Sequence, residues 1–257
     1  MDDIQNTIQQ KLSEIERTHG VRVIFACESG SRAWGFASAD SDYDVRFVYA
    51  RRVGDYLRLE KTRDVIEYEL NEVYDINGWD IQKLLRLLAK SNPVIFEWTD
   101  SPIVYRTSAE WERVRAILSD FASEKRLLYH YLSMAKNNIR SYFKADSVIL
   151  KKYLYVLRPI LACEWVLEKH SPPPTMFSAL CDAVLPAELA DSVSHLLEVK
   201  KNASEKATGA HIQPLDDFIF AQIAKVEEIV RAMPNERTAD WGKLDAVFAE
   251  IVGLRAN

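Results

Sequence analysis

Apolar positions follow two different spacings along the chain. Near the N-terminus they recur at helical spacing, at Ile4, Ile8, Leu12 and Ile15. This spacing predicts an amphipathic helix over residues 2–19. Further on, short runs are either continuously apolar and β-branched or alternate between apolar and polar residues. These runs predict strands over residues 21–26, 45–50, 62–70 and 72–79, with Asn71 at the turn of a hairpin between the last two.

After these strands the periodicity becomes helical. Asp80 is placed as the N-cap of one helix, and Asn92 with Pro93 begins the next. From residue 108 onward the strand patterns stop, and helices are predicted over residues 109–121, 124–145, 148–169, 177–185, 187–202, 216–233 and 239–254. The change of pattern predicts a sheet domain over residues 1–105 and a helical bundle over residues 106–257, with the boundary near Tyr105.

Composition is that of an ordinary globular protein, with 257 residues of which 48% are hydrophobic. The formal net charge of −5 argues against a polybasic nucleic-acid-binding coat and leaves room for a local basic groove. The cysteines, Cys27, Cys163 and Cys181, have neither disulfide nor metal-ligand spacing. The polar N-terminus is unlike a signal peptide, and no apolar run reaches membrane-spanning length. We therefore expect a cytoplasmic protein with no membrane association.

The chemistry-bearing residues gather between the first two predicted strands. Asp42 and Asp44 stand at the start of the second strand. Residues two apart on a strand share a face, which places these carboxylates about 6–7 Å apart along the chain. Two carboxylates this close repel each other unless a cation lies between them. Their oxygen atoms suit Mg²⁺ or Mn²⁺ rather than zinc.

A Gly-Ser pair, Gly30 and Ser31, follows the first predicted strand. The glycine allows close approach of the backbone or a positive φ. Backbone N–H groups after it, together with the Ser31 hydroxyl, are suited to holding phosphate oxygens. A phosphate-binding loop beside paired carboxylates is the layout that nucleotidyl transfer requires.

The ordered set of motifs resembles a known family. The run ESGSRAWGFASADSDYDVRFVY over residues 28–49 is similar to the Gly-Ser and Asp-x-Asp pattern of the DNA polymerase beta-type nucleotidyltransferase superfamily. Together with GWDIQKLLRLLAKSNPVIFEW, SPIVY and KKYLYVLRPILA it resembles more closely the YcgL/RlaP-like group, predicted nucleotidyltransferases of which some are linked to RNA repair. The resemblance implies an α+β fold, with an N-terminal nucleotidyltransferase-type mixed β-sheet flanked by helices and a C-terminal helical bundle that closes the nucleotide cleft.

The resemblance also implies roles for these acidic residues. Asp42 and Asp44 would bind the catalytic metal, and a third carboxylate would bind it beside the acceptor and help to deprotonate the acceptor. We favour Asp80 for this third position, with Asp75 and Glu67 as open alternatives. Asp80 also has a purely structural interpretation, as the cap of its helix.

The phosphate contacts follow from the same resemblance. Gly30, Ser31 and Arg32 would hold the β- and γ-phosphates of the nucleotide. In the helical half, Lys152 and Arg158 are candidates for further triphosphate contacts, because fixed cations stabilise the charge that develops on transfer. The alternative for these two residues is an ordinary solvated basic face.

The expected reaction is transfer of a nucleoside monophosphate from an NTP to an acceptor with release of pyrophosphate. ATP is the favoured nucleotide, Mg²⁺ or Mn²⁺ the cofactor, and an RNA end the favoured acceptor. A protein or small-molecule hydroxyl is an alternative acceptor. A non-catalytic nucleotide- or RNA-binding module is the alternative of a different class.

Overall fold

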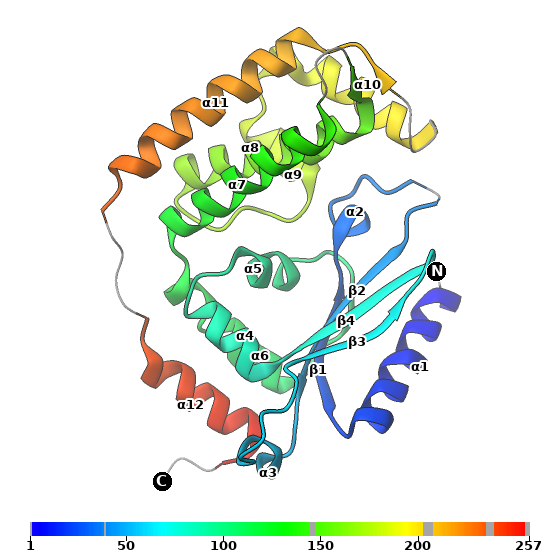
Figure 1. Cartoon of the computed structure of the whole chain (residues 1–257), viewed down its shortest axis with the longest axis vertical. Coiled ribbons are helices and arrows are strands. Elements are labelled where there is room, and N and C mark those ends of the chain that lie inside the picture. The colour runs from blue at the N-terminus through cyan, green and yellow to red at the C-terminus, as the bar shows by residue number, and fades with distance from the viewer. Residues whose placement is uncertain (1, 39, 144–146, 203–207, 235–238, 255–257) are drawn as a thin grey trace. The chain divides into compact units, whose positions relative to one another are not determined.

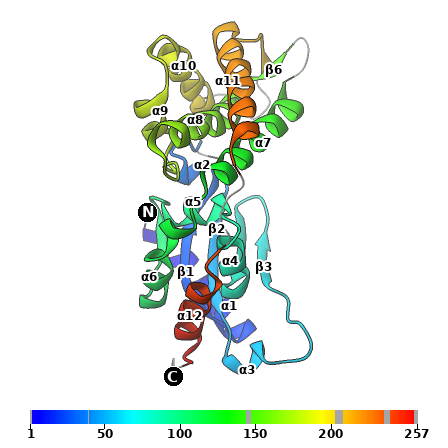
Figure 2. The ribbon, with the colours of Figure 1, turned by 90° about the vertical axis from the view of Figure 1, so that its left-hand side faces the viewer.

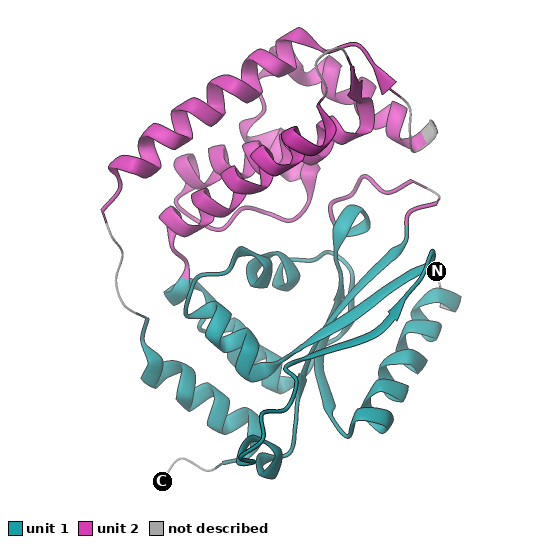
Figure 3. Cartoon of the chain, viewed as in Figure 1, with its two compact units in different colours: residues 1–33, 42–121, 238–257 teal, residues 34–41, 122–237 magenta. Residues whose placement is uncertain are grey.

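A computed structural model gives the fold and describes residues 2–38, 40–143, 147–202, 208–234 and 239–254. Two compact units share the chain (Figure 3). The first comprises Met1–Ala33, Asp42–Phe121 and Thr238–Asn257, and the second comprises Trp34–Ser41 and Ala122–Arg237. These bounds differ from the ranges 1–105 and 106–257 expected from the pattern, because each unit is assembled from separate stretches of the chain.

The first unit is built on a five-stranded sheet with the order β3-β4-β2-β1-β5 (Figure 1). The strands are β1 (Arg22–Glu28), β2 (Tyr43–Ala50), β3 (Val65–Leu70), β4 (Tyr74–Asp80) and β5 (Val104–Arg106). β2 and β4 are parallel and the other neighbours are antiparallel, so the expected mixed sheet is confirmed. In the predicted β3–β4 hairpin, the Asn71 side chain accepts hydrogen bonds from the backbone N–H groups of Val73 and Tyr74, both at 2.8 Å.

Strand alternation assigns the two faces of this sheet. The buried residues Val45, Phe47 and Tyr49 belong to one cluster with the apolar stripe of α1 (Asp2–His19), which covers that face (Figure 1). The opposite face carries α4 (Ile81–Leu88), α5 (Pro93–Thr99) and α6 (Ala109–Arg115). There Trp111 of α6 stacks on Phe25 of β1, with 4.1 Å between the ring centroids.

Shorter elements complete the first unit. These are α2 (Gly30–Ala33), α3 (Val53–Tyr56) and the 3₁₀ turn η1 (Leu118–Phe121). The last helix, α12 (Trp241–Val252), returns from the far end of the sequence to pack on α4 and α6. The helical stretch after residue 108 therefore contributes to the sheet unit at both of its ends.

The second unit is helical, as expected. It contains α7 (Glu124–Tyr142), η2 (Leu150–Lys152), α8 (Tyr153–Lys169), α9 (Phe177–Val184), η3 (Ala187–Leu189), α10 (Ala190–Asn202) and α11 (Gln213–Ala232). The end predicted for the helix over residues 124–145 lies outside the described residues. The expectation of no strands beyond residue 108 is wrong, because β6 (Val148–Ile149) pairs antiparallel with β7 (Thr208–Gly209). Two-residue strands are too short to produce an alternating pattern.

The loop between the Gly-Ser pair and Asp42 belongs to the helical unit. Phe36 packs edge-on against Tyr155 and Phe177, with centroid distances of 5.7 and 5.5 Å. The backbone oxygen of Trp34 accepts a hydrogen bond from the Phe177 N–H at 2.9 Å. The chain therefore leaves the sheet unit after Ala33 and re-enters it at Asp42.

Among the helices that the structure describes, none has both the length and the apolar character needed to cross a bilayer. All three cysteines are free thiols, and Cys27 and Cys163 are buried as small core residues, as expected from their apolar surroundings.

Candidate active site

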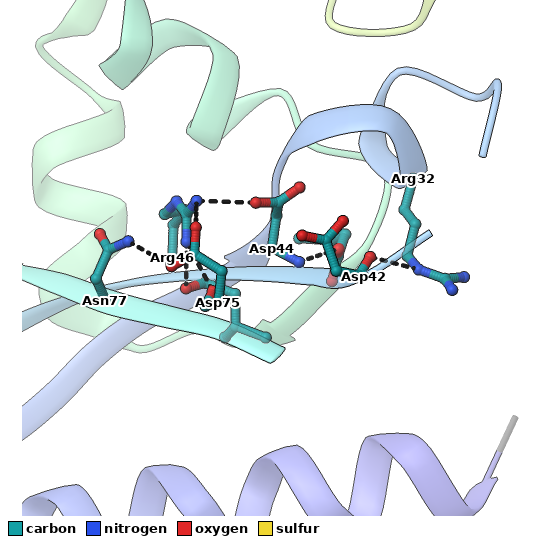
Figure 4. A network of polar contacts seen from close by, with 8 residues as sticks. Arg32, Asp42, Asp44, Arg46, Asp75 and Asn77 are labelled. Carbon is teal, nitrogen blue, oxygen red and sulfur yellow. Dashed lines mark hydrogen bonds and ion pairs between the residues drawn. The ribbon is translucent and has the colours of Figure 1, made fainter. Parts of the chain in front are cut away.

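The Asp42–Asp44 pair lies at the start of β2. Val45 and Phe47 face α1, so alternation turns Asp44 to the opposite face of the sheet. Asp42 immediately precedes the strand and is exposed. Figure 4 shows both carboxylates rising on the same side of the strand, as the spacing predicted. Neighbouring charge from Asp42 disfavours ionisation of Asp44, so the two groups interact electrostatically.

Gly30 brings the predicted phosphate-binding loop into contact with Asp44. Its φ is +60°, and a Cβ built on it would lie 2.0 Å from Asp44 Oδ2. Only glycine tolerates both conditions. The N–H of Ser29 donates to the Asp44 carbonyl oxygen at 2.8 Å, and Ser31 is buried one residue after the glycine. The Gly-Ser pair and the second carboxylate are thus parts of one site.

A buried glutamate, Glu28, holds the backbone of Asp44 in place. Glu28, the last residue of β1, is fully buried, and its Oε1 accepts a hydrogen bond from the Asp44 backbone N–H at 2.8 Å. Its Oε2 accepts from the Tyr105 hydroxyl. Burial raises the pKa of Glu28 to about 7, against the opposing effect of these two hydrogen bonds. We did not identify Glu28 from the sequence, although an acidic residue ending an apolar strand is a recognisable signal.

Asp75 on β4 is the carboxylate that faces Asp44. The parallel register pairs Asp44 with Asp75. One guanidinium nitrogen of Arg46 lies 2.9 Å from Asp44 Oδ1 and 2.6 Å from Asp75 Oδ2 (Figure 4). Asn77 donates to Asp75 Oδ1 at 3.2 Å.

The same network sets the protonation of Asp44. Burial is the main cause that raises the pKa of Asp44 to about 6. Arg46 opposes this shift, whereas Asp42 and Asp75 add to it. Three carboxylates and one guanidinium therefore share the site.

The structure does not bring Asp80 to this site, which corrects our favoured choice for the third carboxylate. Asp75 and Asp80 are an odd number of residues apart on β4, so their side chains leave opposite faces. Asp80 pairs in register with Tyr49, at the far end of β2 from Asp44. Its side chain accepts hydrogen bonds from the Gln82 N–H at 2.8 Å and the Tyr56 hydroxyl at 3.2 Å. The structural interpretation of Asp80, as the N-cap of α4, is confirmed.

The other open alternative, Glu67, lies on β3 with an exposed side chain. It forms an ion pair with Arg63 at 2.7 Å. Of the alternatives to Asp80, Asp75 is thus the one whose carboxylate shares a partner, Arg46, with Asp44.

Arg32 lies beside the acidic pair. Its Nε donates to the Asp42 carbonyl oxygen at 2.9 Å, and its guanidinium lies 3.9 Å from the centre of the Tyr43 ring. These contacts hold the cation next to the residues predicted to bind metal and phosphate.

Lys152 and Arg158 belong to the helical unit. The Lys152 ammonium lies over the rings of Tyr142 and Tyr155, at 4.9 and 4.4 Å from their centres. Arg158 is only 1% exposed and donates to the Thr175 carbonyl oxygen at 3.3 Å. Burial lowers the pKa of Lys152. Their role as triphosphate contacts stays a prediction.

The acidic pair fits a magnesium ion of the kind that works with a nucleotide. Among the described residues, no three acidic, histidine or cysteine side chains form a ready-made metal cage. Mg²⁺ in phosphoryl-transfer sites is commonly held by one or two carboxylates together with substrate phosphates. Asp42 and Asp44 supply such carboxylates, and the burial that disfavours the Asp44 anion also favours a cation beside it.

Comparisons with known proteins cover nearly the whole chain. A family model described as "RlaP: RNA repair pathway DNA polymerase beta family" matches residues 4–250. The protein named "Uncharacterized protein YcgL" from Bacillus subtilis (strain 168) is 40% identical over 252 residues. That alignment spans 97% of this chain and 96% of the relative. The matched residues 4–250 include most of both compact units.

Proposed function

Since this chain belongs to the RNA repair pathway DNA polymerase beta family, we propose that it is a metal-dependent nucleotidyltransferase. It transfers a nucleoside monophosphate from an NTP, with ATP favoured, to an RNA end and releases pyrophosphate. The observation that carries the proposal is the contact between the Gly30 backbone and the Asp44 carboxylate. This contact supports a site in which phosphate and divalent cation are bound side by side.

Each residue near this contact has a distinct task. Asp42 and Asp44 hold Mg²⁺ or Mn²⁺, and the bound ion supplies charge stabilisation for the transferring phosphoryl group. The backbone N–H groups after Gly30, with Ser31, hold phosphate oxygens. Arg32 adds a cation beside them, anchored on the Asp42 carbonyl oxygen.

Asp75 is the third carboxylate in this proposal. Its register with Asp44 and their shared contact with Arg46 support this role in place of Asp80. Arg46 bridges the two carboxylates and offsets part of their charge. The acceptor hydroxyl binds between Asp75 and the nucleotide. Glu28 holds the Asp44 backbone from the buried side.

The proposal is tested by supplying the protein with each of the four NTPs, labelled at the α-phosphate, together with total RNA, cell protein or a metabolite pool. We expect Mg²⁺-dependent label on RNA ends with the wild type, and none with Asp42→Asn. Asp42 is exposed, so this variant is expected to keep its fold. Asp191→Asn, at an exposed position of α10, is the matched control and is expected to transfer normally.

The other results have definite meanings. Label on protein or on metabolites would replace RNA as the acceptor. NTP binding without transfer to any pool would identify a non-catalytic nucleotide-binding module. Full transfer by Asp42→Asn would contradict the assignment of the metal site.

A further inference from the structure

Arg46 connects the two acidic strands of the candidate active site. It lies on β2, two residues after Asp44, so both side chains leave the same face of the sheet. β2 is an inner strand flanked by β1 and β4, and Figure 2 shows it between β1 and the edge strand β3. Asp75 comes from β4 and lies in register with Asp44. An arginine at this position therefore reaches a carboxylate of its own strand and one of the neighbouring strand.

The Arg46 guanidinium is held by oxygen atoms on both strands. Its Nη2 lies 2.9 Å from Asp44 Oδ1 and 2.6 Å from Asp75 Oδ2. Its Nη1 donates to the backbone oxygen of Asp75 at 2.7 Å and to that of Val45 at 3.3 Å. The side chain is only 15% exposed. A guanidinium is always charged and weakly hydrated, so a partly buried position between two carboxylates suits it. Arg46 is thus a fixed positive charge that Asp44 and Asp75 share.

A cation shared by two carboxylates is also what a second metal ion would be. In sites with two metal ions the ions lie about 3.5–4 Å apart and stabilise the attacking and the leaving oxygen. An ion bound to Asp44 Oδ1 and Asp75 Oδ2 would need both oxygens at about 2.0–2.1 Å. It would have to take these oxygens from Nη2 and leave a partly buried guanidinium without its anionic partners. Such an exchange is unfavourable.

The other side of Asp44 differs from the side that Arg46 occupies. Figure 4 shows Asp44 between Arg46 and Asp42. Asp42 is exposed, and Asp44 Oδ2 lies against the Gly30 backbone, where phosphate oxygens are expected. The Asp42 side of Asp44 is therefore the side suited to an ion that also contacts a nucleotide.

We propose that Arg46 takes the place of a second divalent ion, so that the site binds one Mg²⁺ per chain, at Asp42 and Asp44. This inference rests on the proposed function in one respect, namely that these two residues bind a divalent ion. Arg46 is a positioning residue that holds Asp75 beside Asp44. Asp75 then contacts the acceptor through its own carboxylate and is not a metal ligand. The charge that Arg46 supplies does not depend on the concentration of Mg²⁺.

The test counts bound Mn²⁺, which is paramagnetic and accepts the same oxygen ligands as Mg²⁺. The protein is titrated in the presence of an ATP analogue with a methylene group between its α- and β-phosphates, because phosphates contribute ligands in such sites. The electron paramagnetic resonance signal of free Mn²⁺ gives the number of ions bound per chain. The spectrum of the bound ions distinguishes a close, magnetically coupled pair from isolated ions, and thus a second site ion from an adventitious surface ion.

Two substitutions of Arg46 separate its charge from its bulk. Arg46→Met removes the charge and keeps a long side chain, whereas Arg46→Lys keeps a cation. The matched control is Arg63→Gln, which removes an arginine from the exposed ion pair with Glu67 on β3.

We expect one isolated Mn²⁺ per chain in the wild type, in Arg46→Lys and in Arg63→Gln. Arg46→Met should bind two coupled ions, because Asp44 and Asp75 then face each other without a cation between them. Adding Asp75→Asn to Arg46→Met should remove the second ion, since one of its two carboxylates is lost.

A coupled pair of ions in the wild type would overturn the inference and leave the proposed reaction intact. A single ion in folded Arg46→Met would also overturn it, and urea unfolding establishes whether this variant is folded. If Arg46→Met does not fold, the wild type and Arg46→Lys carry the test, because a coupled pair in either contradicts the inference and one isolated ion in both supports it.

The ion count also separates this inference from the proposed reaction. One isolated ion in the wild type, with no transfer of label to any acceptor, would count against the reaction and support the role of Arg46. Absence of any bound ion in the wild type would overturn the inference, whatever the transfer assay gives.

Discussion

Three neighbours hold the Asp44 carboxylate and its backbone in place. The Gly30 backbone lies against the Oδ2 atom, Arg46 binds Oδ1 at 2.9 Å, and Glu28 accepts the backbone N–H at 2.8 Å. A side chain held from several sides loses little further freedom when a cation or a phosphate binds, so the position is preorganised. The two predictions that follow concern these single residues.

Gly30→Ala should displace Asp44, because the new Cβ would meet Oδ2 at 2.0 Å. Gly20→Ala is the matched control, since Gly20 also has a positive φ, +62°, but an added Cβ there meets nothing within 4 Å. The control should lose about 1 kcal/mol of unfolding free energy from backbone strain alone. Gly30→Ala should lose clearly more and should also lose Mg²⁺-dependent NTP binding. Equal losses of stability, with NTP binding intact, would show that the contact has no role.

Glu28 should make the free energy of unfolding depend on pH. Its pKa is raised to about 7 in the folded protein, so the folded state holds a proton that the unfolded state releases above about pH 4.5. The wild type should therefore lose stability as pH rises from about 4.5 to about 7, by about 3 kcal/mol from this group. Glu28→Gln should lack this loss. Urea unfolding of both proteins at about pH 4.5 and about pH 8, in EDTA, measures the difference; identical pH dependence would contradict the assignment.

At the scale of elements, alternation along β4 places its two aspartates, Asp75 and Asp80, on opposite faces of the sheet. Asp75 and Asn77 share the face of Asp44, whereas Ile76 and Gly78 face α1. The fit on the α1 face is close, since a Cβ on Gly78 would lie 2.2 Å from the Phe47 ring. A shift of β4 by one residue would therefore exchange the two faces and break this packing. The register of one strand thus decides which aspartate joins the site.

Asp75→Asn and Asp80→Ala should separate catalysis from stability. Asp75 is partly exposed and lies at the site, so Asp75→Asn should lower kcat of nucleotidyl transfer at least tenfold, about 1.4 kcal/mol of transition-state stabilisation, with little change in stability. Asp80→Ala removes the α4 cap and should cost about 1–2 kcal/mol of unfolding free energy, while transfer continues. Steady-state kinetics and urea unfolding of both variants measure the two effects. Loss of transfer in Asp80→Ala alone would restore Asp80 as the third carboxylate.

At the scale of the whole molecule, sequence order and compact unit do not coincide. The helical unit takes the loop Trp34–Ser41 from between α2 and β2, and the sheet unit takes α12 from the end of the chain. The segments of the two units therefore alternate along the sequence. Cutting the chain at residue 105 would leave the sheet without α6 and α12.

Leu244→Ala on α12 should therefore destabilise the N-terminal sheet. Leu244 is buried in the sheet unit, and its truncation should cost about 2–4 kcal/mol. Hydrogen exchange should then speed up in α4 and α6. The matched variant Leu215→Ala, at a buried position of α11, should act on α7 and α8 instead. Faster exchange confined to α7 and α8 in Leu244→Ala would contradict the assignment of α12 to the sheet.

Prediction from sequence succeeded where a residue acts through its near neighbours in the chain. The hairpin turn at Asn71 and the caps at Asp80 and Asn92 are local hydrogen-bond patterns, and the structure confirms each of them. The helix over residues 2–19 was found from its apolar stripe alone. Glu28 was missed because its partners, Asp44 and Tyr105, come from other strands.

The sequence by itself determined the change from strands to helices along the chain and the side-by-side placement of Asp42 and Asp44, because these follow from spacing within short stretches. The resemblance of its motifs to a known family added the expectation of a mixed sheet. Only the tertiary structure decided that Asp75 rather than Asp80 faces Asp44, since that depends on the register between two strands joined by a long connection. It alone also decided that α12 packs within the sheet unit, against α4 and α6. Contacts between distant segments depend on how whole elements pack, and local periodicity carries no record of that packing.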